Sequence, residues 1–458
     1  MDPYKKKVFT VLGILLAVSF GINRWVYRDT GPLAPELFLA PAGKEATAFE
    51  SFQTIMQSDW KDGYVAPILE IISFVAEDRR PVLYDLLKAR TGASNEGSKA
   101  WWEWYWQSGI EPYEGYPVYK QYLYQQFDPA MGLFFGAARP VAIPMDQIFW
   151  QQMKPNVIKP MVFSPNQSPD KVDFIGQGNI VVGVRLGEEG RAYPRELLTM
   201  HRLIEDRILG DHVYLFYSPL SGAVCAYTLR EGAKEYTWRH SGFVARADEV
   251  FYDEETGSMW SPISGTPISG PLVGTKSPFK PVPLAQISYA QWLEENPSTR
   301  VAMPWREVEY RPDAEYVSYL AEPKTSIPFP WKDDRLDKKA PVVVVRDDAL
   351  QEPGKGPLVV FVNHLISNPV THLERNGKKV VFLTTPRGQV RCFFSEDVQF
   401  DRAIQDEAQS IDGKRWKIRG QRLVSEEGRE LEAVAVHPML WMAARSWFPE
   451  LELLKGGE

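Results

Sequence analysis

The chain has 458 residues, of which 44% are hydrophobic and 24% charged, and 52 basic residues stand against 59 acidic ones. This composition is typical of a globular protein and excludes fibrous, collagenous and disordered chains. The formal net charge of -7 gives no general electrostatic attraction to a polyanion, so we expect no nucleic-acid partner.

Cysteine and histidine are scarce. The two cysteines, Cys225 and Cys392, are too few and too far apart for a disulfide framework, a zinc ribbon or a haem-attachment motif. The chain has six histidines and carries no Walker-type loop, nucleophile elbow or H-E-x-x-H pair. We therefore predict no cofactor, and we expect both thiols to be buried as small apolar groups.

The first 28 residues have the pattern of a transmembrane anchor. Three lysines precede an uncharged run that begins at Val8, and residues 8–27 can span a bilayer if Arg24 snorkels towards the head groups. Trp25 and Tyr27 fit the aromatic belt at the far interface, with the N-terminus in the cytoplasm. A cleaved signal peptide is the alternative.

Beyond the anchor the composition and the hydrophobic pattern of the chain change several times. Residues 29–47, rich in Pro and Gly, predict an extended tether. Apolar residues spaced by three or four predict an all-helical, aromatic-rich region over 48–139. Short apolar runs predict two tandem, mainly-β units with short helices, at 140–304 and 338–458, joined by a charged, Pro-rich linker at 305–337. The expected fold class is α+β.

The helical region contains the densest aromatic cluster. These candidate interface residues, to which the anchor adds Trp25 and Tyr27, are Trp101, Trp102, Trp104, Tyr105 and Trp106. They could form a docking surface for a partner or the bilayer, because Trp and Tyr combine an apolar body with a polar end. They could instead clamp the helical region onto the next unit, which the helical spacing of Trp102 and Trp106 favours.

The two β units show internal duplication. Residues 213–227 align without gaps on residues 380–394, which places Pro219 on Pro386 and Cys225 on Cys392. Farther on, residues 289–297 parallel residues 441–449, so each unit is expected to end in an aromatic helix stopped by Pro. The second unit is therefore predicted to be a degenerate copy of the first, and the interface between such units is a common place for a cleft.

The chain resembles a known family on four segments of the first unit, which read RAYPRELLTMHRLIED (191–206), FYSPLSG (216–222), HSGF (240–243) and YDEETGSMWSPISGTPISGPLVGT (252–275). It resembles the uncharacterised bacterial family called domain of unknown function 3179, from about Ile143 to the C-terminus. The resemblance implies an exported or membrane-anchored protein and brings no established activity.

The chain also departs from the pattern of that family, which reads H-E-x-x-N-D, Y-C-P-L and Y-D-R-x-T-G-S-x-W-x-Q. Here Arg202 and Glu205 stand in the first motif, Ser218 replaces the Cys, Glu254 the Arg and Pro262 the Gln. Residues that shape the fold are kept while several reactive ones are replaced. This pattern is expected when a fold is retained for binding or scaffolding.

One group of residues could still carry chemistry. A helix is expected from Arg195 to about Ile208, and His201 and Glu205 would project from one face of it as metal ligands or an acid–base pair. His240 would be a third ligand, and either Asp206 or Asp253 a fourth. The alternative is that these side chains are hydrogen-bonded structural residues, since a lone pair at this spacing is common on helices.

Two further patterns have simple structural interpretations. The many Gly and Pro residues between Asp253 and Gly274 predict tight turns between short strands rather than a phosphate-binding loop. The basic run from Lys414 to Arg422 alternates with Trp416 and Ile418, which predicts a solvated strand face, with an acidic partner surface as the alternative.

The function that these observations favour is that of a non-catalytic accessory subunit. One transmembrane helix would insert in the bacterial inner membrane beside a larger integral membrane complex, of the respiratory or photosynthetic electron-transfer kind, and the periplasmic domains would brace it. The alternatives are a periplasmic metal-binding protein or enzyme that uses His201, Glu205, Asp206 and His240, and an envelope module that binds a peptide or a glycan.

Overall fold

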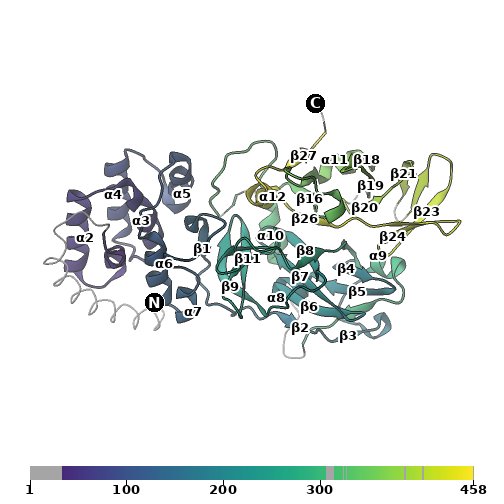
Figure 1. Ribbon diagram of the computed structural model, residues 1–458, viewed down its shortest axis with the longest axis horizontal. Coiled ribbons are helices and arrows are strands. Elements are labelled where there is room, and N and C mark those ends of the chain that lie inside the picture. The colour runs from purple at the N-terminus through teal and green to yellow at the C-terminus, as the bar shows by residue number, and fades with distance from the viewer. Residues whose placement is uncertain are drawn as a thin grey trace.

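The computed structural model describes residues 33–305, 314–322, 324–325, 327–385, 388–404 and 407–456. An all-helical part forms one end of an elongated molecule, and sheets with short helices between their strands form the rest (Figure 1), which confirms the α+β class. The predicted anchor, with Trp25 and Tyr27, lies outside the described residues. Within them, no helix combines the length and the apolar character needed to cross a bilayer.

The helical region is built around a buried apolar helix, α3, whose eight residues are all buried. Its neighbours α4 and α5 both end at glycines with left-handed backbone, Gly92 and Gly109. The elements are η1 (Pro35–Ala42), α2 (Ala46–Ser58), α3 (Val65–Ile72), α4 (Arg80–Thr91), α5 (Gly97–Ser108), α6 (Tyr116–Gln125) and α7 (Pro129–Gly132).

The extended tether predicted for residues 29–47 is wrong over Pro35–Ala42. These residues form the 3-10 helix η1, and Phe38 within it is fully buried. The ring of Phe38 packs against Tyr64, Tyr113 and Tyr119. Burial of the apolar side chains between Pro35 and Pro41 stabilises a helix that Pro and Gly content alone argued against.

A buried ion pair joins the helical region to the first β unit. The Lys120 ammonium lies 2.7 Å from the Glu70 carboxylate and donates a second hydrogen bond to the carbonyl of Ile148 at 2.9 Å. The hydroxyls of Tyr116 and Tyr124 also donate to Glu70, so its charge is compensated in the core. Because Ile148 begins strand β1 (Ile148–Trp150), this network fixes α3 and α6 to the first β unit.

Three sheets make up the first unit, with strand orders β1-β9-β10-β11-β12, β13-β8-β7-β6-β2 and β14-β4-β5-β15-β3. The strands are β1 (Ile148–Trp150), β2 (Met161–Val162), β3 (Asn166–Gln167), β4 (Ile180–Leu186), β5 (Glu189–Pro194), β6 (Leu203–Ile208), β7 (Asp211–Ser218), β8 (Ala223–Leu229), β9 (Trp238–Ala245), β10 (Asp248–Asp253), β11 (Met259–Ser261), β12 (Thr266–Ser269), β13 (Phe279–Pro281), β14 (Ala285–Ser288) and β15 (Arg300–Ala302). The helices are α8 (Arg195–His201) and α9 (Tyr289–Glu295), and α10 (Ala314–Ala321) follows the unit.

The second unit has sheets of order β26-β16-β17-β27, β18-β19-β20 and β21-β22-β23-β24-β25. Its strands are β16 (Pro341–Val345), β17 (Leu358–Phe361), β18 (Val370–Arg375), β19 (Lys378–Thr384), β20 (Val390–Phe394), β21 (Phe400–Ile404), β22 (Glu407–Ser410), β23 (Arg415–Arg419), β24 (Arg422–Ser425), β25 (Glu430–Glu432), β26 (Val436–Leu440) and β27 (Glu452–Leu454). Its helices are α11 (Val362–Ser367) and α12 (Trp441–Trp447).

One sheet topology occurs in both units. The orders β14-β4-β5-β15 and β26-β16-β17-β27 each combine two antiparallel pairs with one parallel pair at the end. In both units a short helix follows the second strand and leads into an antiparallel meander, β6-β7-β8 or β18-β19-β20. The helices α9 and α12 likewise follow β14 and β26 directly. This is the arrangement expected of two related units.

The units contact each other reciprocally. Strand β26 of the second unit packs on β8 of the first, where the amide of Ala226 donates to Nε2 of His437 at 3.4 Å. In the equivalent place, β14 of the first unit packs near β20 of the second. Each meander thus lies against a strand from the opposite unit, as in a two-fold dimer contained in one chain.

The two cysteines occupy corresponding strands but differ in register. Cys225 on β8 lies opposite Phe216, and Cys392 on β20 lies opposite Phe382. The connection between the two paired strands is one residue longer in the second unit. Residues 219–222 connect β7 to β8 in the first unit, and residues 385–389 connect β19 to β20 in the second. Both thiols are buried, and burial raises the pKa of each.

Candidate functional site

The expected helix over residues 195–208 is wrong in its second half. Helix α8 ends at His201 because Arg202 adopts a left-handed backbone conformation, with φ of 60°. The following residues form strand β6, in which Glu205 lies opposite Tyr214. His201 and Glu205 therefore do not share a helix face, and the acid–base or metal pair based on that spacing is not formed.

His201 and Glu205 belong to separate environments. His201 is buried, its Nδ1 lies 2.8 Å from the carbonyl of Lys159, and its ring meets that of Trp305 edge-on. Burial lowers the pKa of His201. Glu205 instead faces His212, with Oε1 3.3 Å from Nδ1, and burial raises its pKa.

Asp206 points to the opposite side of β6, into the core. It accepts a hydrogen bond from the Tyr193 hydroxyl at 2.9 Å and lies 3.5 Å from the Arg191 guanidinium. Burial raises the pKa of Asp206, which Arg191 only partly offsets. Asp206 is therefore a core residue that holds β5 against β6.

His240 takes part in a buried polar cluster that sequence reasoning missed. Its Nε2 lies 3.8 Å from the Glu249 carboxylate, which also receives the Nε hydrogen bond of Arg202 at 3.2 Å. Burial acts to raise the pKa of Glu249, but Arg202 and His240 together hold it below its usual range. The available signal was the acidic pair Asp248 and Glu249 directly before the apolar run of residues 250–252.

Asp248 extends this cluster towards the turn that holds Ser218 and Ser221. The Ser221 hydroxyl donates to Asp248 at 2.7 Å. Burial raises the pKa of Asp248 to about 7, and the neighbouring charge of Glu249 adds to the effect. The hydroxyl of Tyr319 on α10 donates to the carbonyl of Leu220 at 2.7 Å and so fastens the turn from outside. The Ser221 hydroxyl is thus committed to a carboxylate rather than to an imidazole base.

These side chains do not assemble a metal centre. Asp253, the remaining candidate ligand, accepts hydrogen bonds from Thr256 and from the indole N–H of Trp260. Across the described parts of the chain, no three His, Cys, Asp or Glu side chains are grouped as ligands. The geometry therefore gives no support to a metal site built on His201, Glu205, Asp206, His240 and Asp253.

The aromatic cluster of α5 is mainly buried. The prediction that it forms a docking surface is therefore wrong. Trp101, Trp102 and Tyr105 are buried, and Trp104 and Trp106 are partly buried. The ring of Trp102 meets that of Phe149 on β1 edge-on. The indole of Trp106 donates to Asp146 at 2.6 Å. These contacts are those of a clamp between the helical region and the first unit.

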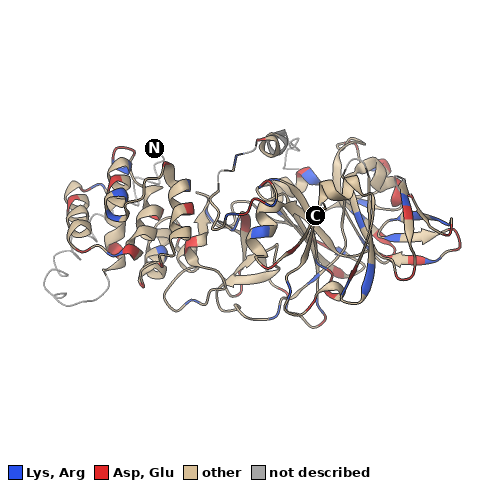
Figure 2. Cartoon of the chain, turned by 90° about the horizontal axis from the view of Figure 1, so that it is seen from above, with Lys and Arg blue, Asp and Glu red and all other residues tan. Residues whose placement is uncertain are grey.

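The basic run on β23 and β24 is balanced by nearby acidic residues. Arg415 lies 2.8 Å from Glu426, and Arg422 lies 3.2 Å from both Glu430 and Glu188. Figure 2 shows the two charge signs interleaved at this end of the molecule. This surface is a solvated, ion-paired face, and it offers no concentrated positive charge to an acidic partner.

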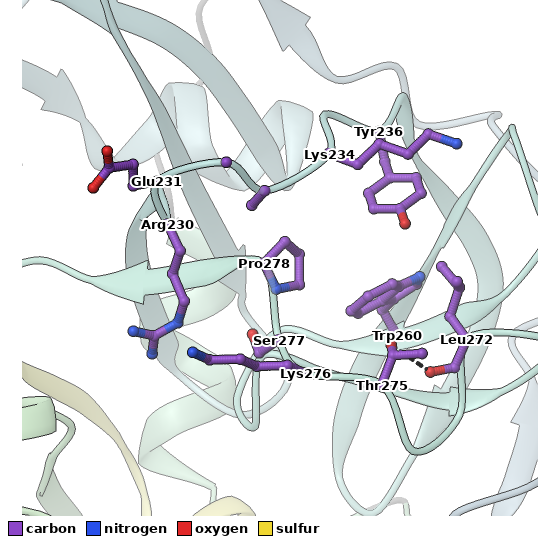
Figure 3. A pocket seen from close by; sticks show the side chains of 12 residues that line it. Arg230, Glu231, Lys234, Tyr236, Trp260, Leu272, Thr275, Lys276, Ser277 and Pro278 are labelled. Atoms are coloured by element: carbon purple, nitrogen blue, oxygen red, sulfur yellow. Dashed lines mark hydrogen bonds between the residues drawn. The ribbon is translucent and has the colours of Figure 1, made fainter.

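A pocket lies beside the motif segment of the first unit (Figure 3). It has a volume of about 320 Å³ and lies between loops 230–236 and 272–278. Its apolar lining is formed by Tyr236, Trp260, Leu272 and Pro278. Trp260 connects it to the motif, since Asp253 accepts the indole hydrogen bond at 2.8 Å.

Three basic side chains line the same pocket. They are Arg230, Lys234 and Lys276, and Glu231 is the acidic residue among those that line it. The guanidinium of Arg230 forms two hydrogen bonds with the carboxylate of Asp348 in the second unit. The ammonium of Lys234 lies 5.1 Å from the centre of the Tyr236 ring. An apolar floor beneath a basic rim suits a ligand that is anionic at one end.

Residues 154–451, more than half of the chain, match the family model described as Protein of unknown function (DUF3179). That match includes the motif segments around α8, the Ser218 turn and Trp260, and it extends over both β units. No curated protein and no solved structure matches the chain. The resemblance seen in the sequence is thus confirmed, and the chain belongs to the DUF3179 family.

Proposed function

We propose that this protein is a non-catalytic accessory subunit of a larger integral membrane protein complex. Residues 8–27 would anchor it in the bacterial inner membrane, and the folded part would brace the complex on the periplasmic side. The observation that carries the proposal is the continuous hydrophobic core. One cluster of buried apolar side chains includes residues of all three regions, among them Leu37 in the helical region and Leu451 in the second unit.

A continuous core makes the three regions one stiff body. Proteins that close around a substrate usually move domains across small, polar interfaces. Here the regions are joined by buried aromatic contacts, by the network of Glu70 and Lys120, and by reciprocal strand packing between the units. Stiffness of this kind suits a brace.

An exposed apolar patch provides a surface with which such a brace could dock. Phe163 and Leu209 are 51% and 64% exposed, and both have left-handed backbone, which costs of order 1–3 kcal/mol at a non-glycine residue. The ring of Phe163 lies against Arg207 and His212. These two residues are paired across strands β6 and β7, next to the turn that contains Leu209. Arg207 and Glu235 place both charge signs beside the apolar side chains, an arrangement typical of a protein interface.

The proposal is tested by a double substitution in that patch. Phe163→Asp with Leu209→Asp should abolish association with the complex and leave the fold intact, since Asp tolerates left-handed backbone and both sites are exposed. Ile411→Asp is the matched control, because Ile411 is 69% exposed but lies in the second unit. Equal association of the two variants with the complex would contradict the proposed docking surface.

The second candidate function is an envelope binding module. The pocket beside Trp260 favours it, whereas the aromatic cluster of α5 does not, because that cluster is largely buried. The two functions are compatible, since the pocket and the patch are formed by different residues.

A further inference from the structure

We infer that the pocket beside Trp260 binds a small organic anion with an apolar ring or short chain. This goes beyond the accessory role, which needs no ligand. The pocket is close to the lower limit of the volumes typical of small-molecule sites, so it suits one compact molecule rather than a polymer segment.

The floor of the pocket is held in a fixed position. Trp260 is 2% exposed, and its indole N–H is bonded to Asp253, which is itself fully buried and bonded to Thr256. The edge of the Trp238 ring also packs on Trp260, with 4.9 Å between the ring centres. A rigid apolar floor needs no reorganisation when a ligand binds, which favours affinity.

The charges of the rim set the sign of the ligand. Arg230 is held in place by Asp348, whereas Lys276 is exposed and has no carboxylate at ion-pair distance among the described residues. Figure 3 shows the Lys276 side chain extending to the side of the pocket where Arg230 lies. The charge of Arg230 is compensated by Asp348, so Lys276 is the cation that attracts a carboxylate, sulfonate or phosphate whose organic part contacts Trp260 and Leu272.

The test uses naphthalene-1-sulfonate as the probe, titrated calorimetrically into the full chain in lipid nanodiscs, with empty nanodiscs as the blank. Naphthalene-1-methanol serves as the neutral analogue and inorganic sulfate as the bare anion. We expect saturable binding of the sulfonate at one site per chain, and at least about tenfold weaker binding of the alcohol and of sulfate.

Lys276→Glu should weaken binding of the sulfonate at least about tenfold, because it places a like charge beside the anion. Lys171→Glu makes the same charge change at an exposed lysine that does not line the pocket, and it should change affinity less than about twofold. Absence of saturable binding, equal affinities of the two variants, or sulfate binding as tight as that of the sulfonate would overturn the inference. Because the isolated chain is titrated, failure of the accessory role would not affect the result.

Discussion

The guanidinium of Arg391 and the carboxylate of Glu295 lie 3.0 Å apart, and their side chains are 8% and 0% exposed. Arg391 belongs to β20 of the second unit and Glu295 ends α9 of the first, so this ion pair crosses the interface between the units. It lies at the contact of β14 with β20, the counterpart of the contact between β26 and β8.

The first prediction concerns this pair. Arg391→Met should lower the free energy of unfolding by about 3 kcal/mol, because the fully buried Glu295 carboxylate would lose the guanidinium that compensates its charge across the interface. Adding Glu295→Met should restore most of the loss, since two apolar side chains can replace a buried pair. Urea unfolding followed by tryptophan fluorescence measures both changes.

The control for that prediction is an exposed pair. Arg415 and Glu426 are 70% and 58% exposed, so Arg415→Met should cost less than about 1 kcal/mol. If Arg391→Met were no more destabilising than Arg415→Met, the ion pair would not stabilise the interface between the units.

The second prediction is a pH dependence from Asp248. Its pKa is raised by burial from 3.8 to about 7 in the folded chain, so between these values the folded state retains a proton that the unfolded state releases. Asp248 therefore makes the free energy of unfolding fall as pH rises from about 4 to about 7. Above pH 7 the loss of stability caused by ionising this buried carboxyl is complete. Its size is about 4 kcal/mol at most, since each pKa unit corresponds to about 1.4 kcal/mol.

Asp248→Asn removes this titration and keeps an acceptor for the Ser221 hydroxyl. The variant should gain stability relative to the wild type on going from pH 4 to pH 8, and denaturation midpoints over that range measure the difference. A stability difference between variant and wild type that stays constant with pH would show that Asp248 is ionised in the folded state at neutral pH.

The third prediction concerns the clamp formed by Trp106. Trp106→Phe keeps most of the ring but removes the hydrogen bond to Asp146, which is buried. Loss of a donor to a buried carboxylate costs about 1–3 kcal/mol, so the helical region should detach more often. Limited proteolysis should then cleave the segment between α7 and β1 faster than in the wild type.

Trp60→Phe provides the comparison for the clamp. Trp60 also donates to a carboxylate, that of Asp62, but this hydrogen bond is exposed to solvent. Its removal should leave the proteolysis rate nearly unchanged. Equal rates for the two variants would mean that the bond of Trp106 does not hold the regions together.

The sequence predicts the α+β class, because the spacing of apolar residues along the chain differs between helices and strands. The α+β class and the aromatic clamp follow from such patterns. The end of α8 does not, since the left-handed backbone of Arg202 is imposed by the surrounding fold and not by a residue type that favours it. Because of this conformation, Glu205 lies in strand β6 and not in the predicted helix, and it is separated from His201.

The pocket shows a second limit of sequence reasoning. Its floor is formed by Trp260 of the motif segment, but its rim comes from a loop more than twenty residues earlier and from Lys276 just beyond the motif. The association of these residues depends on the pairing of β13 with β8, which brings the two loops together. Non-local strand pairing leaves no short-range signal in the sequence.

The proposed role as an accessory subunit that docks through Phe163 and Leu209 can be tested by the association of the protein in native membranes. The full chain would be purified from membranes solubilised in mild detergent, and quantitative mass spectrometry would identify the proteins that remain with it. We expect one defined membrane complex in near-stoichiometric amount, retained by Ile411→Asp and lost in the Phe163→Asp and Leu209→Asp double variant. A wild-type chain that purifies alone, or a complex retained equally by both variants, would contradict the proposed role.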